Sequence, residues 1–165
     1  MSARQIWQVA AFVRTLGRVE RSKTPGDPRR GEQLCAGKGG CAGCHTVAGR
    51  GGAIGPDLTD IGARSSPAYM RISIIDPEAA VPPDFLQVRV VVKDGRRITG
   101  VRLNEDAFSI QMRDLSNQFH SFWKSELAEL VRDRGRSPMP SYRNVLSSEE
   151  IDDLVAYLES LRGGL

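Results

Sequence analysis

The feature that most constrains this chain is the pentapeptide C-A-G-C-H at residues 41–45. C-x-x-C-H is the attachment motif of a c-type haem. Its two thiols add across the two haem vinyl groups as thioethers, and the histidine that follows lies under the iron as its proximal ligand. The motif therefore predicts one covalently attached haem c, with Cys41 and Cys44 as attachment points and His45 as a metal ligand.

Two other kinds of site contain a C-x-x-C pair, namely a zinc knuckle and a dithiol redox centre. A structural zinc site usually combines two separated ligand pairs, and the only further cysteine, Cys35, provides no second pair. A thioredoxin-like dithiol requires a βαβ context that the flanking sequence lacks. Haem is therefore the better interpretation, and Cys35 is predicted to be a small buried apolar residue.

Helix signals lie on both sides of the motif. Asp27 and Pro28 fit the N-cap and first turn of a short helix that runs toward the cysteines. Near the other end of the chain, Ser147 and Glu150 match a capping box. The helix predicted after this box has apolar residues at helical spacing, namely Ile151, Leu154, Val155, Leu158 and Leu161.

The order of the segments around the motif resembles a known family. The chain carries, in order, G-E-Q-L-C at 31–35, C-A-G-C-H at 41–45, G-P-D-L-T-D-I-G-A-R at 55–64, S-P-M-P at 137–140 and D-L-V-A-Y-L at 153–158. This order resembles class I c-type cytochromes, and is most similar to the haem-binding domain of planctomycete-type and related bacterial multidomain cytochromes. The resemblance implies a mainly α chain with the class I cytochrome c helical fold. In that fold the first and last helices cross near the haem, where a small residue such as Gly31 allows close approach.

The resemblance also implies further contacts to the cofactor. The carbonyl of Pro56 would accept a hydrogen bond from the second imidazole nitrogen of His45 and so orient the ring. Arg64 is a candidate for a haem propionate, with a solvated loop arginine as the alternative. The cofactor-binding residues implied in this way, together with those of the motif, are Cys41, Cys44, His45, Pro56, Leu58, Arg64 and Met139.

The second axial ligand of an electron carrier is expected to be a soft, uncharged donor. Met139 lies between two prolines, just before the last helix, where class I cytochromes present their distal methionine. Flanking prolines restrict the backbone and favour a preorganised loop. The competitor is His120, which lies in a predicted strand and is expected to be exposed. Met70 and Met112 lie in a predicted helix and a predicted strand, and both are expected in the core.

A minimal class I cytochrome c needs only about 100 residues, so much of this 165-residue chain is additional. We assign the excess to an insertion at about residues 84–132. Alternating apolar residues and turn signals predict four strands there, at residues 85–93, 96–103, 107–113 and 118–124. The side chains expected on the apolar faces of the first and third strands are Val88, Val90, Val92, Phe108, Ile110 and Met112. We therefore predict a small antiparallel sheet or partial barrel inserted into the helical domain.

The N-terminal segment repeats part of the last helix. Residues 6–16 align with residues 151–161 at an offset of 145, and most aligned residues are identical or chemically similar. The repeat predicts that residues 1–22 form an extra helix, the closing helix of another cytochrome domain, and that residues 23–165 form the cytochrome c domain of this chain. The alternative is that two unrelated amphipathic helices look alike.

Charge and hydropathy narrow the setting in which the chain acts. The formal net charge is +3, but basic and acidic residues are interspersed without a long basic run. This pattern argues against nucleic acid and is compatible with a redox partner protein, such as a fused or associated dehydrogenase. Covalent haem attachment takes place outside the bacterial cytoplasm, so a periplasmic protein is expected. The chain has no signal peptide and no membrane-spanning segment, as a trimmed piece of a longer exported protein would.

These features predict a monohaem electron-transfer domain rather than an enzyme, with His45 and Met139 bound in both oxidation states. Two alternatives stay open. One is a haem enzyme or gas sensor whose Met139 loop moves away from the iron, and the other gives the inserted sheet a docking role on a larger dehydrogenase. The sequence around Met139 contains no second distal catalytic residue, which argues against the enzyme.

Overall fold

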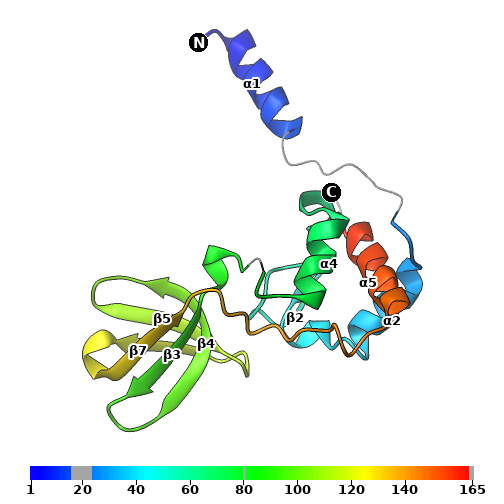
Figure 1. The fold of residues 1–165 in the computed structure, drawn as a ribbon. Helices are drawn as coiled ribbons and strands as arrows, with labels where there is room; N and C mark the ends of the chain where they lie inside the picture. The colour runs from blue at the N-terminus through cyan, green and yellow to red at the C-terminus, as the bar shows by residue number, and fades with distance from the viewer. Residues whose placement is uncertain (16–23, 80, 164–165) are drawn as a thin grey trace.

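The computed structural model of this chain describes residues 1–15, 24–79 and 81–163. Helices gather on one side, a five-stranded sheet lies on the other, and one helix stands apart from both (Figure 1). The α-helices in these ranges are α1 (Ala3–Thr15), α2 (Pro28–Ala36), α3 (Ile61–Arg64), α4 (Pro67–Ile75) and α5 (Ser148–Ser160). The short 3-10 helices are η1 (Cys41–Gly43), η2 (Pro83–Phe85) and η3 (Lys124–Glu126). The strands are β1 (Thr46–Val47), β2 (Arg50–Gly51), β3 (Gln87–Val92), β4 (Arg97–Glu105), β5 (Ser109–Asp114), β6 (Phe119–Trp123) and β7 (Leu127–Asp133).

The predicted helix starts are present in the structure. The side chain of Asp27 caps α2 by accepting a hydrogen bond from the backbone N–H of Arg29 at 2.9 Å. At α5, the backbone N–H of Ser147 donates to Glu150 at 2.8 Å, and the backbone N–H of Glu150 donates to the Ser147 hydroxyl at 3.2 Å. These reciprocal bonds satisfy backbone donors that the first helical turn leaves unpaired.

The crossing of α2 and α5 depends on Gly31, which is buried between the two helices. A Cβ atom at this position would overlap the backbone carbonyl of Asp153, so no larger residue permits the same approach. The buried side chain of Asp153 accepts a hydrogen bond from the backbone N–H of Asp27 at 2.6 Å and lies 3.0 Å from the Arg30 guanidinium. A buried carboxylate is tolerated only when it is paired in this way.

Two apolar cores are present among the described residues, one in each part of the molecule. The helical core contains Cys35, Leu58, Ile61, Met70, Ile74, Leu146, Ile151, Leu154, Val155 and Leu158. The core of the sheet contains Val88, Val90, Val92, Ile110, Met112 and Phe122. Each part therefore buries its own apolar surface, which is the main source of folding free energy for both.

The inserted sheet is antiparallel throughout, with the strand order β6-β5-β4-β3-β7. The β3–β4 hairpin turns at Asp94 and Gly95, where glycine adopts a φ of 92°. Val88, Val90 and Val92 are buried, as their alternation predicts. The expectation of a mainly α chain is only partly met, because this sheet occupies most of the stretch from residue 87 to residue 133.

The fifth strand, β7, was not among the predicted strands. It pairs along the side of β3 away from β4, and its apolar and polar residues do not alternate regularly: Leu130 and Val131 are adjacent, and so are Arg132 and Asp133. The pairing places Gln87, where the sheet begins, opposite Asp133, where the sheet ends. The chain therefore leaves and re-enters the helical part at neighbouring points.

The prediction that Phe108 lies on the apolar face of the third strand is wrong. The side chain of Asp106 accepts hydrogen bonds from the backbone N–H groups of Phe108 and Ser109, each at 2.7 Å. This turn delays the start of β5 to Ser109, so Phe108 lies outside the strand and is 72% exposed. Ile110 and Met112 are buried as predicted.

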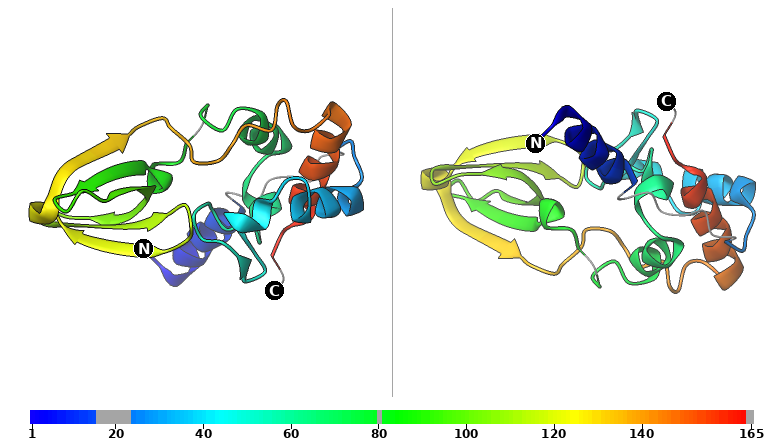
Figure 2. Two further views of the ribbon diagram at one scale, coloured as in Figure 1. Left: turned by 90° about the horizontal axis from the view of Figure 1, so that it is seen from below. Right: turned by 90° about the horizontal axis from the view of Figure 1, so that it is seen from above.

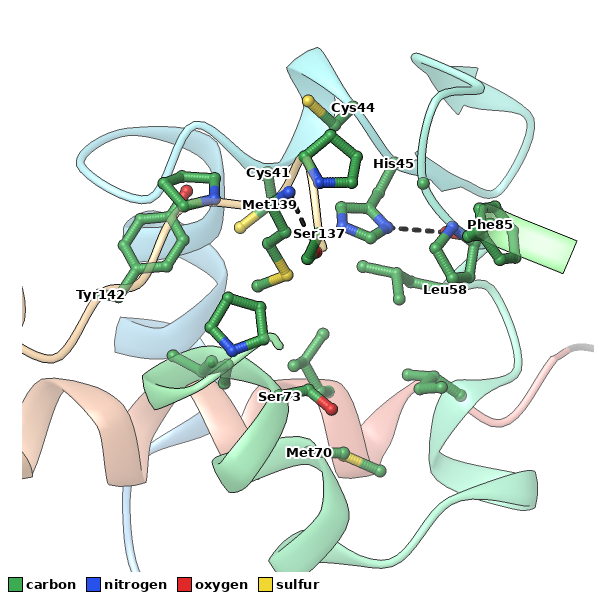
Figure 3. A pocket seen from close by; sticks show the side chains of 18 of the residues that line it. Cys41, Cys44, His45, Leu58, Met70, Ser73, Phe85, Ser137, Met139 and Tyr142 are labelled. Atoms are coloured by element: carbon green, nitrogen blue, oxygen red, sulfur yellow. Dashed lines mark hydrogen bonds between the residues drawn. The ribbon is translucent and has the colours of Figure 1, made fainter. Parts of the chain in front are cut away.

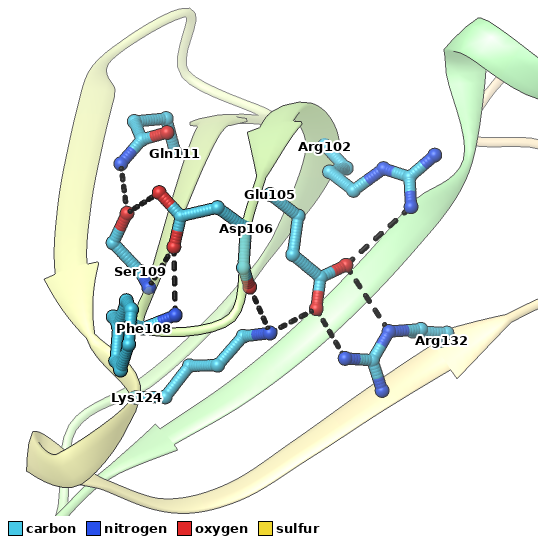
Figure 4. A network of polar contacts seen from close by, with 8 residues as sticks. All are labelled: Arg102, Glu105, Asp106, Phe108, Ser109, Gln111, Lys124 and Arg132. Atoms are coloured by element: carbon cyan, nitrogen blue, oxygen red, sulfur yellow. Dashed lines mark hydrogen bonds and ion pairs between the residues drawn. The ribbon is translucent and has the colours of Figure 1, made fainter.

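A charged network joins the two strands that flank β3 (Figure 4). Glu105 of β4 pairs with Arg132 of β7 and, at 2.8 Å, with Lys124. Arg102 lies 3.4 Å from the same carboxylate. The hydrogen bond from Arg132, supported by Lys124, lowers the pKa of Glu105 to about 2, so this brace is ionised at neutral pH.

The sheet extends away from α2, α4 and α5 in both views of Figure 2. A contact between the two parts is made by the β5–β6 turn, where Asn117 adopts a φ of 67° and its Oδ1 accepts a hydrogen bond from the backbone N–H of Ala53 at 3.1 Å. Ala53 belongs to the glycine-rich loop that follows the C-x-x-C-H motif. Within the described ranges, no helix is both long and apolar enough to cross a membrane.

Candidate haem site

A pocket lies between the C-x-x-C-H segment, helix α4 and the loop before α5 (Figure 3). The predicted residues that line it are Cys41, Cys44, His45, Pro56, Leu58 and Met139. Further lining residues with apolar or aromatic side chains are Ile54, Ile61, Tyr69, Met70, Ile74, Val81, Phe85, Tyr142, Leu154 and Leu158. A pocket with apolar walls and a few positioned polar atoms is typical of a cofactor site.

The imidazole of His45 is held by the backbone in one orientation. Its Nδ1 lies 2.7 Å from the carbonyl oxygen of Pro56, which is the predicted hydrogen bond. Burial lowers the pKa of His45, and the hydrogen bond to the Pro56 carbonyl opposes that effect only in part. The ring is therefore neutral at pH 7, with Nδ1–H as the donor and Nε2 available to a metal.

Gly55 also lies against this ring. A Cβ atom on Gly55 would come within 2.5 Å of His45 Cε1 and 2.7 Å of Nδ1. The backbone N–H of Gly55 donates to the carbonyl of Cys44 at 2.8 Å, so the loop cannot move away without losing a hydrogen bond to the motif itself. The glycine-rich loop thus positions the histidine as well as closing the pocket.

We expect Gly55→Ala to displace the His45 ring, because the added methyl overlaps the ring while the hydrogen bond from Nδ1 to the Pro56 carbonyl holds the ring in place. Overpacking of this kind costs about 1–3 kcal/mol, so a large fraction of the ferric haem protein should lose its low-spin optical spectrum. Gly43→Ala is the matched control, because a Cβ on Gly43 would meet nothing within 4 Å. Equal spectra for the two variants would contradict a positioning role for Gly55.

The two motif cysteines line the pocket, and none of the three cysteines forms a disulfide in the described structure, which includes all of them. Cys35 is buried, as predicted, but it also makes a contact that the sequence did not indicate. A hydrogen bond with the Cys35 thiol lowers the pKa of Cys41, and the same contact together with burial raises the pKa of Cys35. Thiolate character is therefore directed to Cys41, one of the two predicted attachment points.

Met139 reaches the pocket from a loop that is anchored on both sides. Its backbone N–H donates to the Ser137 hydroxyl at 3.1 Å. Three residues later, the backbone N–H of Tyr142 donates to the carbonyl of Ile74, at the end of α4, at 3.0 Å. The Tyr142 hydroxyl donates to the carbonyl of Gly39, just before the C-x-x-C-H motif. The loop is thus fastened to the segment that carries the motif and to the helix that forms the pocket wall.

Two residues weighed at the sequence level lie elsewhere. Arg64 is not among the residues that line the pocket, and its guanidinium instead lies 2.8 Å from Asp60 and donates to the carbonyl of Asp57. His120 is half-buried in β6 rather than exposed, because its Nε2 lies 2.7 Å from Asp114. These ion pairs and hydrogen bonds explain the positions of both side chains without any contact to a cofactor.

Other lining residues were missed at the sequence level. Tyr69, Met70 and Ser73 come from α4, whose unusually apolar sequence could have indicated contact with a buried cofactor. Phe85, which the alternating pattern had assigned to a strand, comes from η2. Met70 is a second methionine at the pocket, but it is also almost fully buried in the helical core.

The donor set fits a haem iron. An imidazole nitrogen and a thioether sulfur are the axial donors of many c-type haems, and the apolar walls limit solvent access to the group between them. The fit also includes the thiols of Cys41 and Cys44, which line the pocket with the histidine and belong to no disulfide, as thioether attachment requires. A zinc knuckle is less consistent with the structure, because the described residues contain no cluster of three or more histidine, cysteine or acidic ligands.

Of the comparisons with known proteins, the one with family models agrees with this fit. None of the curated proteins matches the chain. Among solved structures, SoxXA from P. pantotrophus is 20% identical with a TM-score of 0.44, over 88% of this chain and 90% of that one; identity this low says nothing of a shared function. A family model described as Cytochrome c matches residues 28–115. Because that match spans more than half of the 165 residues and includes the whole C-x-x-C-H motif, the chain belongs to the cytochrome c family, and haem c is its covalently bound cofactor.

Proposed function

We propose that this chain is a monohaem electron-transfer domain in which His45 and Met139 are the two axial ligands and Cys41 and Cys44 carry the thioether bonds. When bound, haem c supplies one-electron chemistry between ferrous and ferric iron. The observation that supports the proposal most directly is that the four side chains line one pocket although they come from segments almost 100 residues apart.

Each of these residues has a separate task. His45 presents Nε2 as a neutral donor, because the Pro56 carbonyl occupies Nδ1–H. Met139 offers a soft sulfur that favours the reduced, less charged iron and so a relatively high potential. Small displacements of either ligand are resisted, by Gly55 behind the imidazole and by Tyr142 behind the methionine loop. A site that keeps the same ligands in both oxidation states needs little reorganisation when an electron moves.

Carbon monoxide distinguishes a carrier from a haem enzyme or gas sensor. The dithionite-reduced protein should bind the gas slowly or incompletely at neutral pH, because the gas has to displace Met139 from a loop anchored at Ser137 and Tyr142. The measurement is the Soret shift after rapid mixing.

The Met139→Ala variant provides the positive control, since its iron would have an easily vacated position and should bind carbon monoxide rapidly. If the unmodified protein bound the gas as fast and as completely as this variant, the electron-carrier proposal would be replaced by the enzyme or sensor.

We also propose that the protein acts in the bacterial periplasm and belongs with the planctomycete-type and related multidomain cytochromes. Covalent haem attachment outside the cytoplasm supports the first point. The order of motifs from residue 31 to residue 158 supports the second. A redox partner protein, such as a fused or associated dehydrogenase, would exchange electrons with the domain.

The inserted sheet is a candidate surface for contact with that partner. Phe119 and Trp123 of the edge strand β6 are 58% and 61% exposed. Phe108, whose carbonyl accepts a hydrogen bond from the backbone N–H of Lys124 next to Trp123, is more exposed still. Aromatic side chains are enriched in protein interfaces. A docking role of the sheet is compatible with electron transfer, because the β5–β6 turn contacts the glycine-rich loop beside His45.

A further inference from the structure

Helix α1 presents an apolar face that is largely exposed in the described structure. It stands apart from the other helices and from the sheet (Figure 1). Ile6, Val9 and Val13 are exposed, with Ile6 at 54% and Val9 at 51%. A solvent-exposed patch of large apolar residues in line on one helix marks a surface that is covered in the functional protein.

The counterparts of these residues in α5 are buried. At the offset of 145 residues, Ile6 corresponds to Ile151, which is 5% exposed, and Val9 corresponds to Leu154, which is 2% exposed. In α5 this face packs against α2, α3 and α4. The same side-chain pattern is therefore buried in α5 and exposed in α1.

The two helices also begin in the same way, which the sequence repeat had not included. The backbone N–H of Ser2 donates to Gln5 Oε1 at 2.7 Å, and the backbone N–H of Gln5 donates to the Ser2 hydroxyl at 3.3 Å. Ser2 and Gln5 correspond, at the same offset, to Ser147 and Glu150 of the α5 capping box. Two unrelated amphipathic helices would not be expected to share the register of both the cap and the apolar face.

We propose that α1 is the closing helix of a second cytochrome c-type domain, and that its apolar face packs on helices of that domain that correspond to α2 and α4. The occupant of the face is thus a helical haem domain in the same polypeptide, with its own C-x-x-C-H motif. This proposal is independent of which residues bind the iron in residues 24–163.

The ion pairs of α5 indicate whether the apolar face of α1 is covered by such a domain or by a second copy of this chain. Ion pairs fasten α5 to the neighbouring helices and loop, and in each of them the acid belongs to α5. These pairs are Asp153 with Arg30 at 3.0 Å, Glu150 with Lys38 at 2.8 Å, and Asp152 with Arg71. A helix that replaced α5 would have to supply acids at these three places.

Helix α1 cannot do so. Its residues at the three corresponding positions are Gln8, Gln5 and Trp7, and none carries a negative charge. If α1 took the place of α5 in another copy, all three cations would face neutral side chains. Lys38 and Arg71 would lose the acids that pair with them, and Arg30 would keep only Asp27, at 3.9 Å. The domain that α1 closes therefore has neutral or acidic residues where α2, its following loop and α4 have these cations.

The test compares this 165-residue chain with the whole polypeptide encoded by its native reading frame, using amide hydrogen exchange and the haem count by pyridine haemochrome. We expect two haems per polypeptide, and α1 amides that exchange at least about a hundredfold more slowly than in the shorter chain, because a packed helix opens far less often than an uncovered one. The α5 amides should be equally protected in both.

Two variants of the whole polypeptide sharpen the result. Val9→Asp should return α1 to fast exchange, because it places a charge on the covered face. The matched control is Arg4→Glu, since Arg4 corresponds to Glu149, which is exposed on α5 and should be tolerated. Equal exchange of α1 in both polypeptides, or a single haem, would overturn the proposal. So would a dimer of the shorter chain that Val9→Asp dissociates, because a second copy would then be the occupant.

Discussion

Replacement of Met139 by alanine should abolish the sulfur-to-iron charge-transfer band of the ferric protein. The same variant should have a lower reduction potential, because loss of the thioether removes the donor that stabilises ferrous iron. The fall is expected to be on the order of 100 mV or more, within the roughly 0.8 V over which axial ligands set haem potentials. Optical spectroscopy and a redox titration measure both effects.

Two control variants test the competing donors. His120→Ala should leave the band and the potential nearly unchanged, because His120 is bonded to Asp114 in the inserted sheet. Met70→Leu should also keep the band, since Met70 packs in the helical core. If the band survived in Met139→Ala but vanished in either control variant, the ligand assignment would move to that residue.

Simultaneous replacement of Cys41 and Cys44 by serine should eliminate covalent haem entirely. A serine hydroxyl does not add to the haem vinyl groups under the conditions in which a thiolate does. The intact mass of the purified polypeptide should then equal that of the apoprotein, and any haem that still associates should be released by acid-acetone extraction. The unmodified 165-residue chain should retain one haem after the same extraction.

Cys35→Ser is the matched control for this experiment. Its thiol contacts Cys41, but it lies in α2 and is buried in the helical core. The variant should keep one covalent haem, with a reduced yield if the contact with Cys35 assists the Cys41 thiolate. A haem that remained bound through Cys35 in the double variant would show that the attachment points had been assigned wrongly.

The parts of the fold that the sequence predicts correctly depend on local interactions. The caps at Asp27 and Ser147 involve atoms within three residues of each other, so their geometry follows from the local sequence. The alternation of Val88, Val90 and Val92 likewise gives one buried strand face whatever the partner strand is. The hydrogen bond between His45 and Pro56 spans only 11 residues and is part of the motif's own loop.

Other features depend on contacts between distant segments, which no local pattern encodes. Strand β7 exists because β3 offers its open edge, and its own side chains alternate too weakly to indicate a strand. Conversely, the turn at Asp106 excluded Phe108 from β5 although its apolar side chain fitted the pattern. The contact between Cys35 and Cys41 also requires the fold of the intervening loop.

The sequence by itself determined the cofactor of this protein and the ends of its main helices, because covalent haem attachment and helix capping are each specified by a few adjacent residues. Only the tertiary structure decided which side chains enclose the cofactor and which apolar faces are covered. Tyr142 reaches Gly39 across more than 100 residues, and the faces of α1 and α5 differ in burial although their apolar patterns match. The free energy of burial depends on what another segment places against a surface, and that is a property of the folded chain.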